Sequence, residues 1–496
     1  MKVCSVAEMR SIDKIASEQF NIPSVVLMEN AANACISEIK HFESFVVICG
    51  KGNNGGDGLA IARRLIVMGK SVKIYLALGE DFSGDALINY NILKSMDAEM
   101  LLDFSALECD IKSAQCVVDA IFGTGFCGNV PEKIAKIIKC INKNAEFVLS
   151  VDVPSGINAD TGAAEMAVCA SKTVTFAGYK KGLLLYPAAD FAGEVLVGDI
   201  SIPHKAFDIE NVKINTTDED FAREIMPKRC ENSHKGDYGK LLVIGGHPQM
   251  KGAVALACLS ALRMGAGLVT ACVPKDTAMS FEDMPYEVMT KALDFDDDCD
   301  EIAEMVNCYD AVLFGNGIGR EEYVATLLEK ILSGINVPLV IDADGLFALS
   351  KKPELIKEKN VILTPHSMEM ARLLGISAEE VEADRFSLSA DFSKKYEVTL
   401  VLKGNHSIIS APDGTQNVNL TGNSGMATAG SGDVLAGMTA ALAAVMPTFD
   451  AAVLAVHLHG KAGDYAAETL SRTSLIASDI INGLPHILPV EKQKKL

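Results

Sequence analysis

The chain has 496 residues, 49% hydrophobic and 22% charged, which is enough for two or three folded domains with sizeable cores. Its 45 basic and 65 acidic side chains give a formal charge of -20, which disfavours nonspecific binding to nucleic acid or anionic membranes. The sequence shows no signal-peptide or membrane-span pattern. Its 13 cysteines form no Cys-x-x-Cys pair, so neither a disulfide framework nor a zinc site is predicted, and a cytoplasmic location is expected.

Two helices and a strand are predicted at the start of the chain. Ser5 and Glu8 have the spacing of a capping box, which predicts a helix over residues 9–20. Apolar periodicity predicts a second helix over residues 25–39, and residues 45–49 form a short apolar run typical of a buried strand.

A glycine-rich segment, residues 50–58, follows this strand and precedes a helix predicted over residues 59–68. Strand, glycine-rich turn and helix in this order are typical of a dinucleotide-type phosphate site. The segment could be only a tight connection. Its five glycines, two asparagines and one aspartate in nine residues favour a binding site.

Further strands are predicted at residues 72–78, 116–121, 147–151 and 172–176, with helical stretches between several of them. This alternation favours a parallel sheet with helices on both faces. Because the carboxyl ends of such strands meet in one crevice, Asn54, Asp119, Asp152 and Ser155 are expected to share a site. In the alternative interpretation, the two aspartates only brace their loops.

Three blocks of this half resemble the signatures of the NAD(P)H-hydrate epimerase domain, the YjeF N-terminal family: Gly-Asn-Asn-Gly-Gly-Asp-Gly, Asp-Ala-Ile-Phe-Gly-Thr-Gly and Ser-Val-Asp-Val-Pro-Ser-Gly-Ile. The resemblance implies that Asn54, Asp119 and Ser155 hold a potassium ion, since oxygen ligands suit a hard, large cation. It implies that Asp119 is also catalytic and moves protons at the epimerised carbon. The substrate-binding residues that it implies are Asn53, Asn54, Gly55, Gly56, Asp57, Gly123, Thr124, Gly125, Phe126, Cys127, Gly128, Asn129 and Asp152.

A domain boundary is predicted near residues 212–230, where the chain turns polar and loses periodicity. The first domain is assigned to residues 1–215 and the second to residues 216–496. A new strand followed by glycines begins at residues 240–246. Both halves are of the α/β type, but no residue-by-residue repeat relates them, so fusion is inferred rather than duplication.

Four further strands are predicted in the second half, at residues 311–314, 338–341, 361–363 and 399–402. Polar or glycine-rich residues follow each strand, so one rim of the sheet is expected to collect them. His366 alone could stabilise a loop, and Lys403 alone could be a solvated charge. Their shared position after successive strands favours a site.

The segment Gly425-Met-Ala-Thr-Ala-Gly-Ser-Gly-Asp-Val-Leu-Ala-Gly437 has the pattern of an anion-binding turn. Gly430 and Gly432 allow close backbone approach to a ligand, and the apolar residues 434–445 predict a buried helix. A helix that begins here directs free N–H groups and the positive end of its dipole at a phosphate. Asp433 is then either a helix N-cap or a base for phosphoryl transfer, and the Gly-x-Gly-Asp spacing favours the base.

The Gly-x-Gly-Asp spacing resembles the signature of the ribokinase-like superfamily. The longer run, with the blocks Asp-Ala-Asp-Gly-Leu and Thr-Pro-His-x-x-Glu, is similar to ADP/ATP-dependent NAD(P)H-hydrate dehydratases. Ala429 replaces a usual glycine and Asn316 a usual proline, where only a looser turn is expected. The resemblance implies substrate contacts from Ala253, Gly319, His366 and the catalytic Asp433, nucleotide contacts from Lys403, Gly404, Asn405, His406, Ser407 and Gly432, and Mg²⁺ placed through water by Glu369.

Together the resemblances imply a Rossmann-like, doubly wound N-terminal domain and a ribokinase-like C-terminal α/β domain. They imply an isomerase that interconverts the R and S forms of NADHX and NADPHX, the 6-hydroxylated coenzymes, and a lyase that dehydrates the S form with ADP. The implied cofactors are K⁺ and Mg²⁺, and a homo-oligomer, tetramer or larger, without nucleic acid or membrane partners is expected. One rival is a small-molecule kinase of the same fold, and another makes the first domain a non-catalytic nucleotide-sensing module. The sequence does not decide whether the dehydratase uses ADP or ATP.

Overall fold

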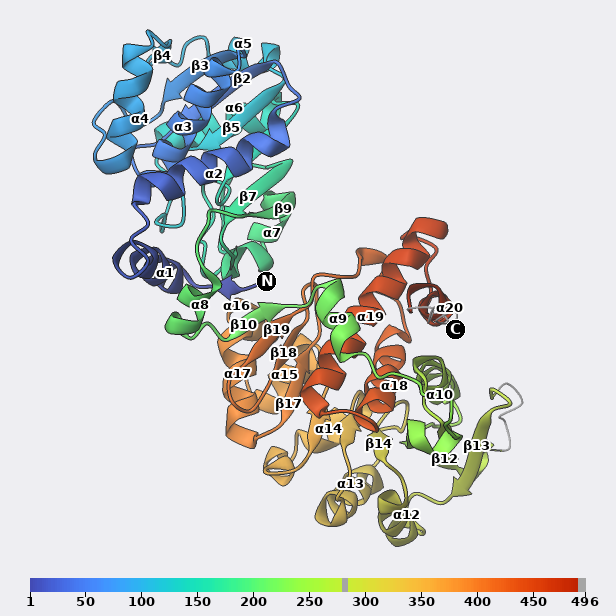
Figure 1. Ribbon diagram of the computed structural model, residues 1–496. Helices are drawn as coiled ribbons and strands as arrows, with labels where there is room; N and C mark the ends of the chain where they lie inside the picture. Colours follow the sequence, from blue (N-terminus) through green and yellow to red (C-terminus); the bar gives the residue numbers. More distant parts are fainter. Residues whose placement is uncertain (279–283, 489–496) are drawn as a thin grey trace. The chain divides into compact units, whose positions relative to one another are not determined.

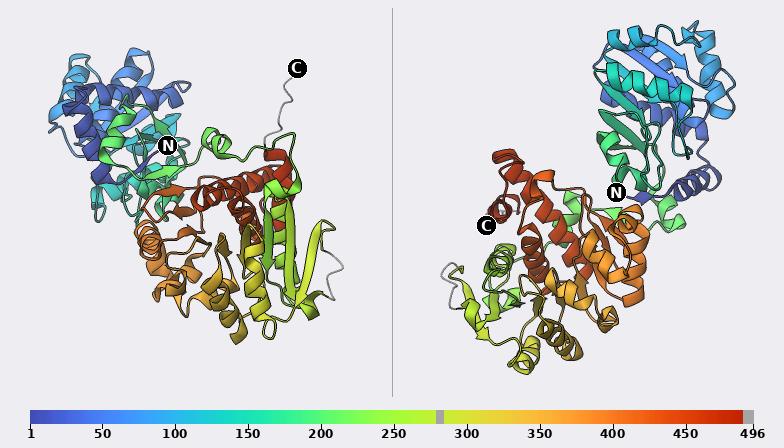
Figure 2. Two further views of the ribbon diagram at one scale, coloured as in Figure 1. Left: turned by 60° about the horizontal axis from the view of Figure 1, so that its bottom comes forward. Right: turned by 180° about the vertical axis from the view of Figure 1, so that it is seen from behind.

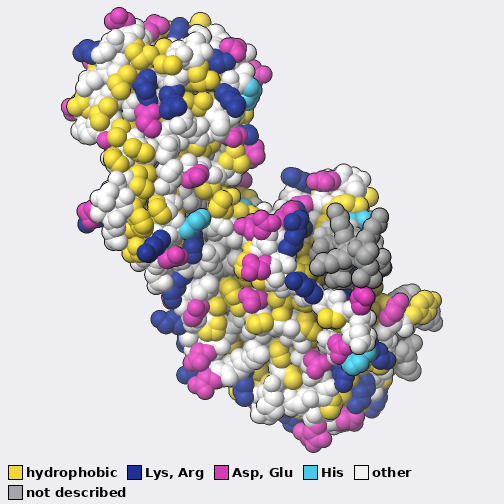
Figure 3. Space-filling view, in the orientation of Figure 1, with side chains coloured by type: hydrophobic (Ala, Val, Ile, Leu, Met, Phe, Trp, Pro, Cys, Tyr) yellow, Lys and Arg dark blue, Asp and Glu magenta, His cyan; other side chains and the backbone are white. Residues whose placement is uncertain are grey.

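The computed structural model describes residues 1–278 and 284–488, and the chain divides into two compact units, Met1–Val212 and Lys213–Leu496 (Figure 1). Strand β10 (Ile214–Thr216), which spans the predicted boundary after residue 215, pairs with β19 (Gln416–Val418) of the second unit. Among the described residues, no helix combines the length and apolar character that crossing a membrane requires. On the face drawn in Figure 3, acidic and basic side chains are interspersed.

The first unit is an α/β fold in which strands and helices mostly alternate. Its strands are β1 (Val3–Cys4), β2 (Ser44–Cys49), β3 (Ser71–Leu76), β4 (Met100–Leu101), β5 (Cys116–Ala120), β6 (Val148–Val151), β7 (Lys172–Phe176), β8 (Tyr179–Lys180) and β9 (Glu194–Gly198). Its helices are α1 (Val6–Glu18), α2 (Ser24–Ile39), α3 (Asn53–Val67), α4 (Gly84–Ser95), α5 (Leu107–Ser113), α6 (Glu132–Asn144), α7 (Ala188–Ala192) and α8 (His204–Glu210).

The main sheet of this unit has the order β4-β3-β2-β5-β6-β7-β9, and all its neighbouring strands are parallel. Both faces are covered, because alternate residues of β2 enter different cores. Val47 packs in a cluster with α2, α3 and α4, whereas Val46 packs in a cluster with α5 and α6. The expected parallel sheet with helices on both faces is confirmed. The order reverses between β2 and β5, which is where such folds bind ligands.

Only the first three residues of the glycine-rich segment form a turn, because α3 begins at Asn53 and not near residue 59. Its glycines let the helix approach the sheet closely. A Cβ on Gly55 would lie 2.0 Å from the Gly50 carbonyl oxygen, and one on Gly58 would lie 2.6 Å from the Ala120 Cβ. The glycines therefore serve close packing, which hydrophobic periodicity does not reveal.

The second unit also alternates strands and helices. Its further strands are β11 (Lys240–Ile244), β12 (Leu268–Pro274), β13 (Val288–Leu293), β14 (Ala311–Phe314), β15 (Leu339–Ile341), β16 (Val361–Leu363), β17 (Thr399–Leu402) and β18 (Ile408–Ser410). Its helices are α9 (Glu219–Ile225), α10 (Lys251–Met264), α11 (Lys275–Ala278), α12 (Cys299–Met305), α13 (Glu322–Gly334), α14 (Asp344–Leu349), α15 (Ser367–Leu374), α16 (Ala378–Ala383), α17 (Arg385–Tyr396), α18 (Ser431–Ala443), α19 (Thr448–Thr469) and α20 (Ala477–Ile487).

Within the described residues, the sheet of the second unit has the order β10-β19-β18-β17-β16-β15-β14-β11-β12-β13. Only β18 runs antiparallel to its neighbours there. Val243 of β11 packs in a core with α10, α18, α19 and α20, whereas Leu242 packs in a core with α12 to α17, so helices cover both faces (Figure 2). The order reverses between β11 and β14, the second switch point of the chain.

Candidate active sites

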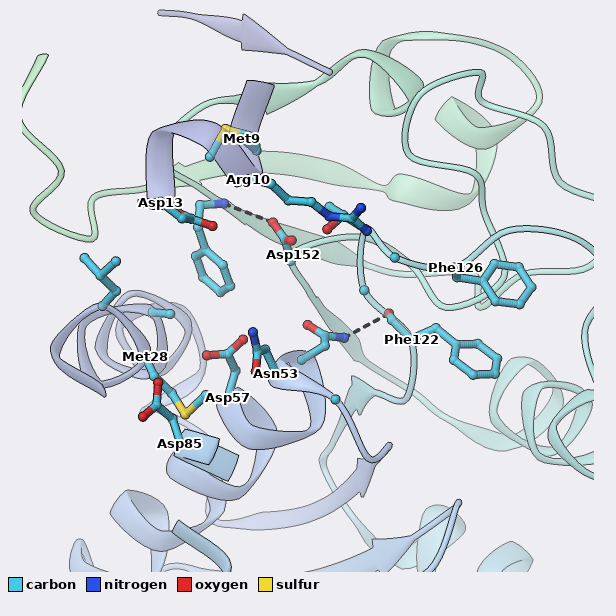
Figure 4. A pocket seen from close by; sticks show the side chains of 18 of the residues that line it. Met9, Arg10, Asp13, Met28, Asn53, Asp57, Asp85, Phe122, Phe126 and Asp152 are labelled. Carbon is cyan, nitrogen blue, oxygen red and sulfur yellow. Dashed lines mark hydrogen bonds between the residues drawn. The ribbon is translucent and has the colours of Figure 1, made fainter. Parts of the chain in front are cut away.

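A cavity of about 650 Å³ lies in the first unit next to the segments that follow β2, β5 and β6 (Figure 4). It is therefore at the switch point of the sheet. The predicted residues that line it are Asn53, Asn54, Asp57, Gly123, Thr124, Gly125, Phe126, Cys127 and Asp152. The other predicted substrate-binding residues do not line it. Gly55 and Gly56 are buried in the packing of α3, and Gly128 and Asn129 are exposed in the loop between β5 and α6.

Asp119 is fully buried and does not line this cavity. Its carboxylate accepts hydrogen bonds from Ser155 N (2.8 Å), Ser155 Oγ (2.5 Å) and Ser150 Oγ (2.9 Å). Burial raises the pKa of Asp119, and the hydrogen bonds from Ser155 and Ser150 offset only part of that increase. The structure therefore brings Asp119 and Ser155 together, but neither residue lines the cavity.

Asn54 provides a buried oxygen close to this pair. Its Nδ2 donates to the Phe122 carbonyl oxygen (2.9 Å), and the Ser155 Oγ lies 3.3 Å from the same oxygen. Within the described part of the chain, Asn54 Oδ1 is buried without a hydrogen-bond partner. An orphaned oxygen near a carboxylate and a hydroxyl fits a cation that takes oxygen ligands.

Lys180, which was not assigned from the sequence, is a buried cation of the cavity. Its side chain is 2% exposed, and its Nζ donates to Asp152 Oδ1, to Thr175 Oγ1 (2.9 Å) and to the Phe176 carbonyl oxygen (2.9 Å). The ammonium group therefore uses all three of its donors within the protein.

Two more carboxyl groups, those of Asp13 and Asp57, line the same cavity (Figure 4). Burial raises the pKa of Asp13 to about 6, an increase that the Lys180 ammonium limits. Burial and the negative charge of Asp152 hold the pKa of Asp57 well above its usual range. The cavity can thus present both protonated and ionised carboxyl groups near neutral pH, as proton transfer requires.

In the second unit, Asp433 lies in the first turn of α18 and is not its N-cap. The N-cap is Gly430, whose φ is 90°, and no side chain caps the helix. Asp433 Oδ1 instead accepts a hydrogen bond from Asn316 Nδ2 (2.7 Å), in the turn after β14. Burial raises the pKa of Asp433 to about 6, although the Asn316 hydrogen bond lowers it. Of the two interpretations of Asp433, the geometry therefore favours the base.

Residues that follow four neighbouring strands converge near Asp433: Asn316, Asp342, Thr364 and Lys403 come after β14, β15, β16 and β17. Asp342 is 1% exposed and accepts hydrogen bonds from Lys403 Nζ (2.9 Å) and Thr364 Oγ1 (2.7 Å). Burial lowers the pKa of Lys403, but the carboxylates of Asp342 and Glu369 more than offset this, so the group stays cationic.

Gly432 lies beside this lysine, because a Cβ there would be 3.4 Å from Lys403 Nζ. The start of α18, which no side chain caps, therefore lies next to the Lys403 ammonium group. Free helix N–H groups together with a cation suit a phosphate group.

His366 and Glu369 form a reciprocal capping box at the start of α15. His366 Nδ1 accepts from Glu369 N (3.4 Å), and Glu369 Oε2 accepts from His366 N (2.9 Å). Burial and the Lys403 charge lower the pKa of His366, so its half-exposed ring is neutral near pH 7. Glu369 Oε2 lies 3.8 Å from Lys403 Nζ, and burial raises its pKa. Both residues therefore stabilise the start of α15, and Glu369 also lies close to Lys403.

Arg385 of α17 holds the predicted nucleotide loop, residues 403–407, through hydrogen bonds to backbone carbonyl oxygens. This side chain is 4% exposed, and its guanidinium donates to the carbonyl oxygens of Leu402 (3.2 Å), Lys403 (3.3 Å) and Asn405 (3.1 Å). A Cβ on Gly404 would lie 2.6 Å from Arg385 Nη2. A glycine is needed there because the guanidinium occupies the space.

Ala253 and Gly319 lie around the turn after β14. A Cβ on Gly317 would be 3.1 Å from the Ala253 Cβ, so the start of α10 faces this turn. Gly319 has a φ of 93°, and its N–H donates to Asp344 Oδ2 (3.2 Å). Both residues thus lie at the second switch point, as Asp433 does.

Sequence reasoning missed several residues that hold these sites. Lys180 ends the short strand β8 between two nearby glycines, and Asn316, whose role was not predicted, stands between two glycines after β14. These glycines could have marked both residues. Arg385 and His459 lie within helices, where the sequence gives them no distinguishing context. His459 of α19 has its Nε2 3.1 Å from the Ser431 carbonyl oxygen, in the anion turn itself.

Fold and sites together define a fused α/β enzyme, with one polar site at each switch point. The second site combines a glycine turn, a lysine and an aspartate, a set of groups that suits phosphoryl transfer. One family model, described as YjeF-related protein N-terminus, matches residues 24–182, and another, described as NAD(P)H-hydrate dehydratase, matches residues 241–486.

Curated relatives cover nearly the whole chain. Proteins named bifunctional NAD(P)H-hydrate repair enzyme Nnr are 39% identical in Moorella thermoacetica (98% of this chain and 97% of the relative) and 38% identical in Thermofilum pendens (98% and 96%). The Escherichia coli relative of the same name is 32% identical, over 94% of this chain and 89% of its own length. The chain belongs to the family of bifunctional NAD(P)H-hydrate repair enzymes, which confirms the resemblance drawn from the motif blocks.

Solved structures match the ribokinase-like part of the chain. The ADP/ATP-dependent NAD(P)H-hydrate dehydratase from Bacillus subtilis, co-crystallized with ATP/Mg²⁺, is 29% identical over 55% of this chain and 96% of its own, with a TM-score of 0.50. A ribokinase-like superfamily protein from Enterococcus faecalis is 27% identical over 55% of this chain and 95% of its own, also with a TM-score of 0.50. The expected ribokinase-like fold is confirmed.

Proposed function

We propose that this chain repairs hydrated NADH and NADPH in two steps. The first unit interconverts the R and S forms of NADHX and NADPHX, and the second dehydrates the S form at the expense of ADP. The observation that carries the proposal is the Asp433 carboxylate, which lies at an uncapped helix start beside Lys403 instead of capping that helix. Whole-chain similarity to bifunctional repair enzymes supports both activities over a kinase fused to a sensing module.

In the second unit, Asp433 takes the proton of the 6-hydroxyl group as its oxygen bonds to the terminal phosphorus of ADP. The bond from that phosphorus to AMP breaks, and the phosphorylated oxygen becomes a good leaving group. Loss of phosphate from C6, with a proton from the adjacent ring carbon, restores the dihydronicotinamide. Lys403 and the glycine turn at Gly430 and Gly432 stabilise the transferring charge.

We assign substrate contacts in this unit to Ala253, Gly319 and His366, and nucleotide contacts to Gly432 and to residues 403–407. Glu369 would hold Mg²⁺ through water, and its carboxylate beside the phosphate-binding lysine fits a hard cation. When bound, Mg²⁺ neutralises charge on the nucleotide phosphates.

In the first unit, we propose that the cavity holds the hydrated nicotinamide, against residues 53–57, residues 123–129 and Asp152. Asn54, Asp119 and Ser155 would hold K⁺, which fits the orphaned Asn54 Oδ1 next to them. When bound, K⁺ supplies a fixed positive charge that attracts substrate oxygen atoms.

Asp119 is proposed to move protons at the epimerised carbon. Its hydrogen bond from Ser155 Oγ, which also accepts from Phe122 N (2.8 Å), links it to the loop that lines the cavity. Asp57 and Asp152 line the cavity directly and are the competing candidates.

We also propose a cytoplasmic location and a homo-oligomer, tetramer or larger. All 13 cysteines are free in the structure, which supports a reducing compartment. The oligomer rests on the family resemblance, and sedimentation of the purified chain tests it.

The direct test incubates the purified chain with racemic NADHX, Mg²⁺ and either ADP or ATP, and follows the recovery of NADH absorbance. Asp433→Asn keeps the size of the side chain but removes its basicity, so dehydration should fall by about 10²- to 10⁴-fold while epimer exchange continues. A mutant that dehydrates at nearly the unchanged rate would show that Asp433 is not the base. A kinase fused to a sensing module would recover no NADH with either nucleotide.

A further inference from the structure

Asn316 occupies a position where only a looser turn was expected, and the structure shows a different arrangement. The residue is fully buried in the turn after β14. Its Nδ2 donates to Asp433 Oδ1 (2.7 Å) and also to Asp342 Oδ2 (3.2 Å). One amide group therefore bridges the Asp342 carboxylate, after β15, and the Asp433 carboxylate, in the first turn of α18.

The orientation of this amide is dictated by its neighbours. Ionised carboxylates only accept hydrogen bonds, so the amide nitrogen must face them and the amide oxygen must face away. Asn316 Oδ1 is then buried, with no hydrogen-bond partner in residues 1–278 and 284–488. Such an unsatisfied group costs stability, and an apolar side chain would fill the same space without that cost. The amide is thus explained by the carboxylates that it contacts and not by packing.

The groups around Asp433 differ in whether they favour or oppose its ionised form. Asp342 and Asp344 lie close enough to oppose the negative charge of Asp433, while Lys403 favours it. Lys403 Nζ is hydrogen-bonded to Asp342 Oδ1, and on the α19 side His459 contacts the backbone of Ser431. Among the described side chains, the direct hydrogen bond to the Asp433 carboxylate thus comes from Asn316.

We propose that Asn316 is a positioning residue that keeps Asp433 ionised and directs its second carboxylate oxygen at the hydroxyl group of the substrate. This inference rests on the proposed role of Asp433 as the base. Because Asn316 touches Asp433 and not the reacting atoms, its removal changes the pH range of dehydration. It leaves the reaction intact where Asp433 is ionised without help.

The sign of the effect follows from the hydrogen bond. The Asn316 donor stabilises the carboxylate form, and burial has already raised the pKa of Asp433 to about 6. A hydrogen bond to a charged group corresponds to a shift of about one pH unit, so its loss moves the acid limb of the pH profile upward by about that amount. At pH 5.5 the ionised fraction then falls roughly eightfold, whereas at pH 8 it falls by only about a tenth.

The experiment measures kcat/KM for NADHX in the full chain from pH 5 to pH 9, at saturating ADP and Mg²⁺. Asn316→Ala should move the acid limb up by about one unit and leave the rate near pH 8 within about twofold. Asn316→Asp has almost the same shape but adds a third carboxylate, so its limb should move further. Asn307→Ala is the matched control, because Asn307 is an exposed amide of the same unit that donates to the Gly334 carbonyl oxygen (2.9 Å).

Two outcomes overturn the inference: an unmoved acid limb in both Asn316 variants, or an equal loss of rate at every pH. The second would mean that Asn316 is only structural. Asn316→Asp keeps the packing, so it decides the matter if the alanine variant does not fold. Asp433→Asn separates this result from the function itself. If Asp433→Asn abolishes dehydration and the limb stays in place, only the role of Asn316 is wrong. If Asp433→Asn dehydrates normally, the base assignment fails as well.

Discussion

Replacement of Lys180 by methionine removes the ammonium group from the cavity of the first unit and keeps most of the side-chain volume. Lys180 is 2% exposed and makes three hydrogen bonds, to Asp152, Thr175 and Phe176. Its loss leaves Asp152, 15% exposed, as a carboxylate without a paired cation. Asp152 keeps two weaker donors, Thr175 Oγ1 (3.1 Å) and Phe176 N (3.3 Å).

The magnitude follows from this geometry. Breaking a buried ion pair by removing one partner costs about 3–5 kcal/mol. The two remaining donors and the partial exposure of Asp152 place Lys180→Met at the low end, about 3 kcal/mol. Lys136→Met is the matched control, since Lys136 pairs with Glu132 at 2.9 Å with side chains 75% and 86% exposed. Exposed pairs of this kind contribute only about 0.2–1 kcal/mol.

Hydrogen exchange followed by mass spectrometry resolves the first unit without assuming that the whole chain unfolds in one step. A loss of about 3 kcal/mol corresponds to roughly 100-fold faster exchange in peptides from β6 and β7, whereas Lys136→Met should change it by less than about fivefold. The two variants are also compared in epimerisation, which Lys180→Met should impair. Equal exchange rates in the two variants would refute the reasoning that Lys180 and Asp152 are a stabilising buried pair.

Three further predictions concern the cation site, the anion turn and the packing of α3. Asp119→Ala should leave half of a racemic NADHX sample to react slowly, at the rate of spontaneous epimer exchange. Complete consumption at the unchanged rate, when epimerisation is limiting, would contradict the catalytic assignment. Gly432→Val places methyl groups next to Lys403 Nζ, so calorimetric titration should show lost or much weakened nucleotide binding with intact epimerase activity. Unchanged affinity would mean that the turn does not hold phosphate. Gly55→Ala meets the Gly50 carbonyl oxygen at 2.0 Å and should destabilise the first unit by about 1–3 kcal/mol in thermal unfolding. Gly52→Ala, with no atom within 4 Å, should not, and similar melting of both variants would argue against close packing as the reason for Gly55.

The two α/β folds and the rims that carry the polar residues could be predicted because short-range patterns encode them. Apolar runs mark strands, and the motif blocks after those strands were long enough to indicate the family. The start of α3 was mistaken because glycine usually signals a turn, whereas here it lets a helix approach the sheet closely.

The side-chain contacts within the two sites could not be predicted, because the residues that make them are far apart in the sequence. Asn316 and Asp433 are separated by 117 positions, and Lys180 and Asp152 by 28. Only the sheet register brings such pairs together. For the same reason the sequence implied a catalytic Asp119 but could not show that its carboxylate is buried and does not line the cavity.

Strand β10 has a consequence for how the chain is made. It comes directly after the first unit, yet its partner β19 is about 200 residues later, as the hydrogen bond from Thr217 to Asn417 illustrates. During synthesis the first unit can complete its sheet while β10 has no strand to pair with until β19 leaves the ribosome. The strand therefore stays unpaired while the ribosome adds the roughly 200 residues that separate β10 from β19. A clone of the second unit that starts after residue 216 would leave β19 as a bare edge open to other chains.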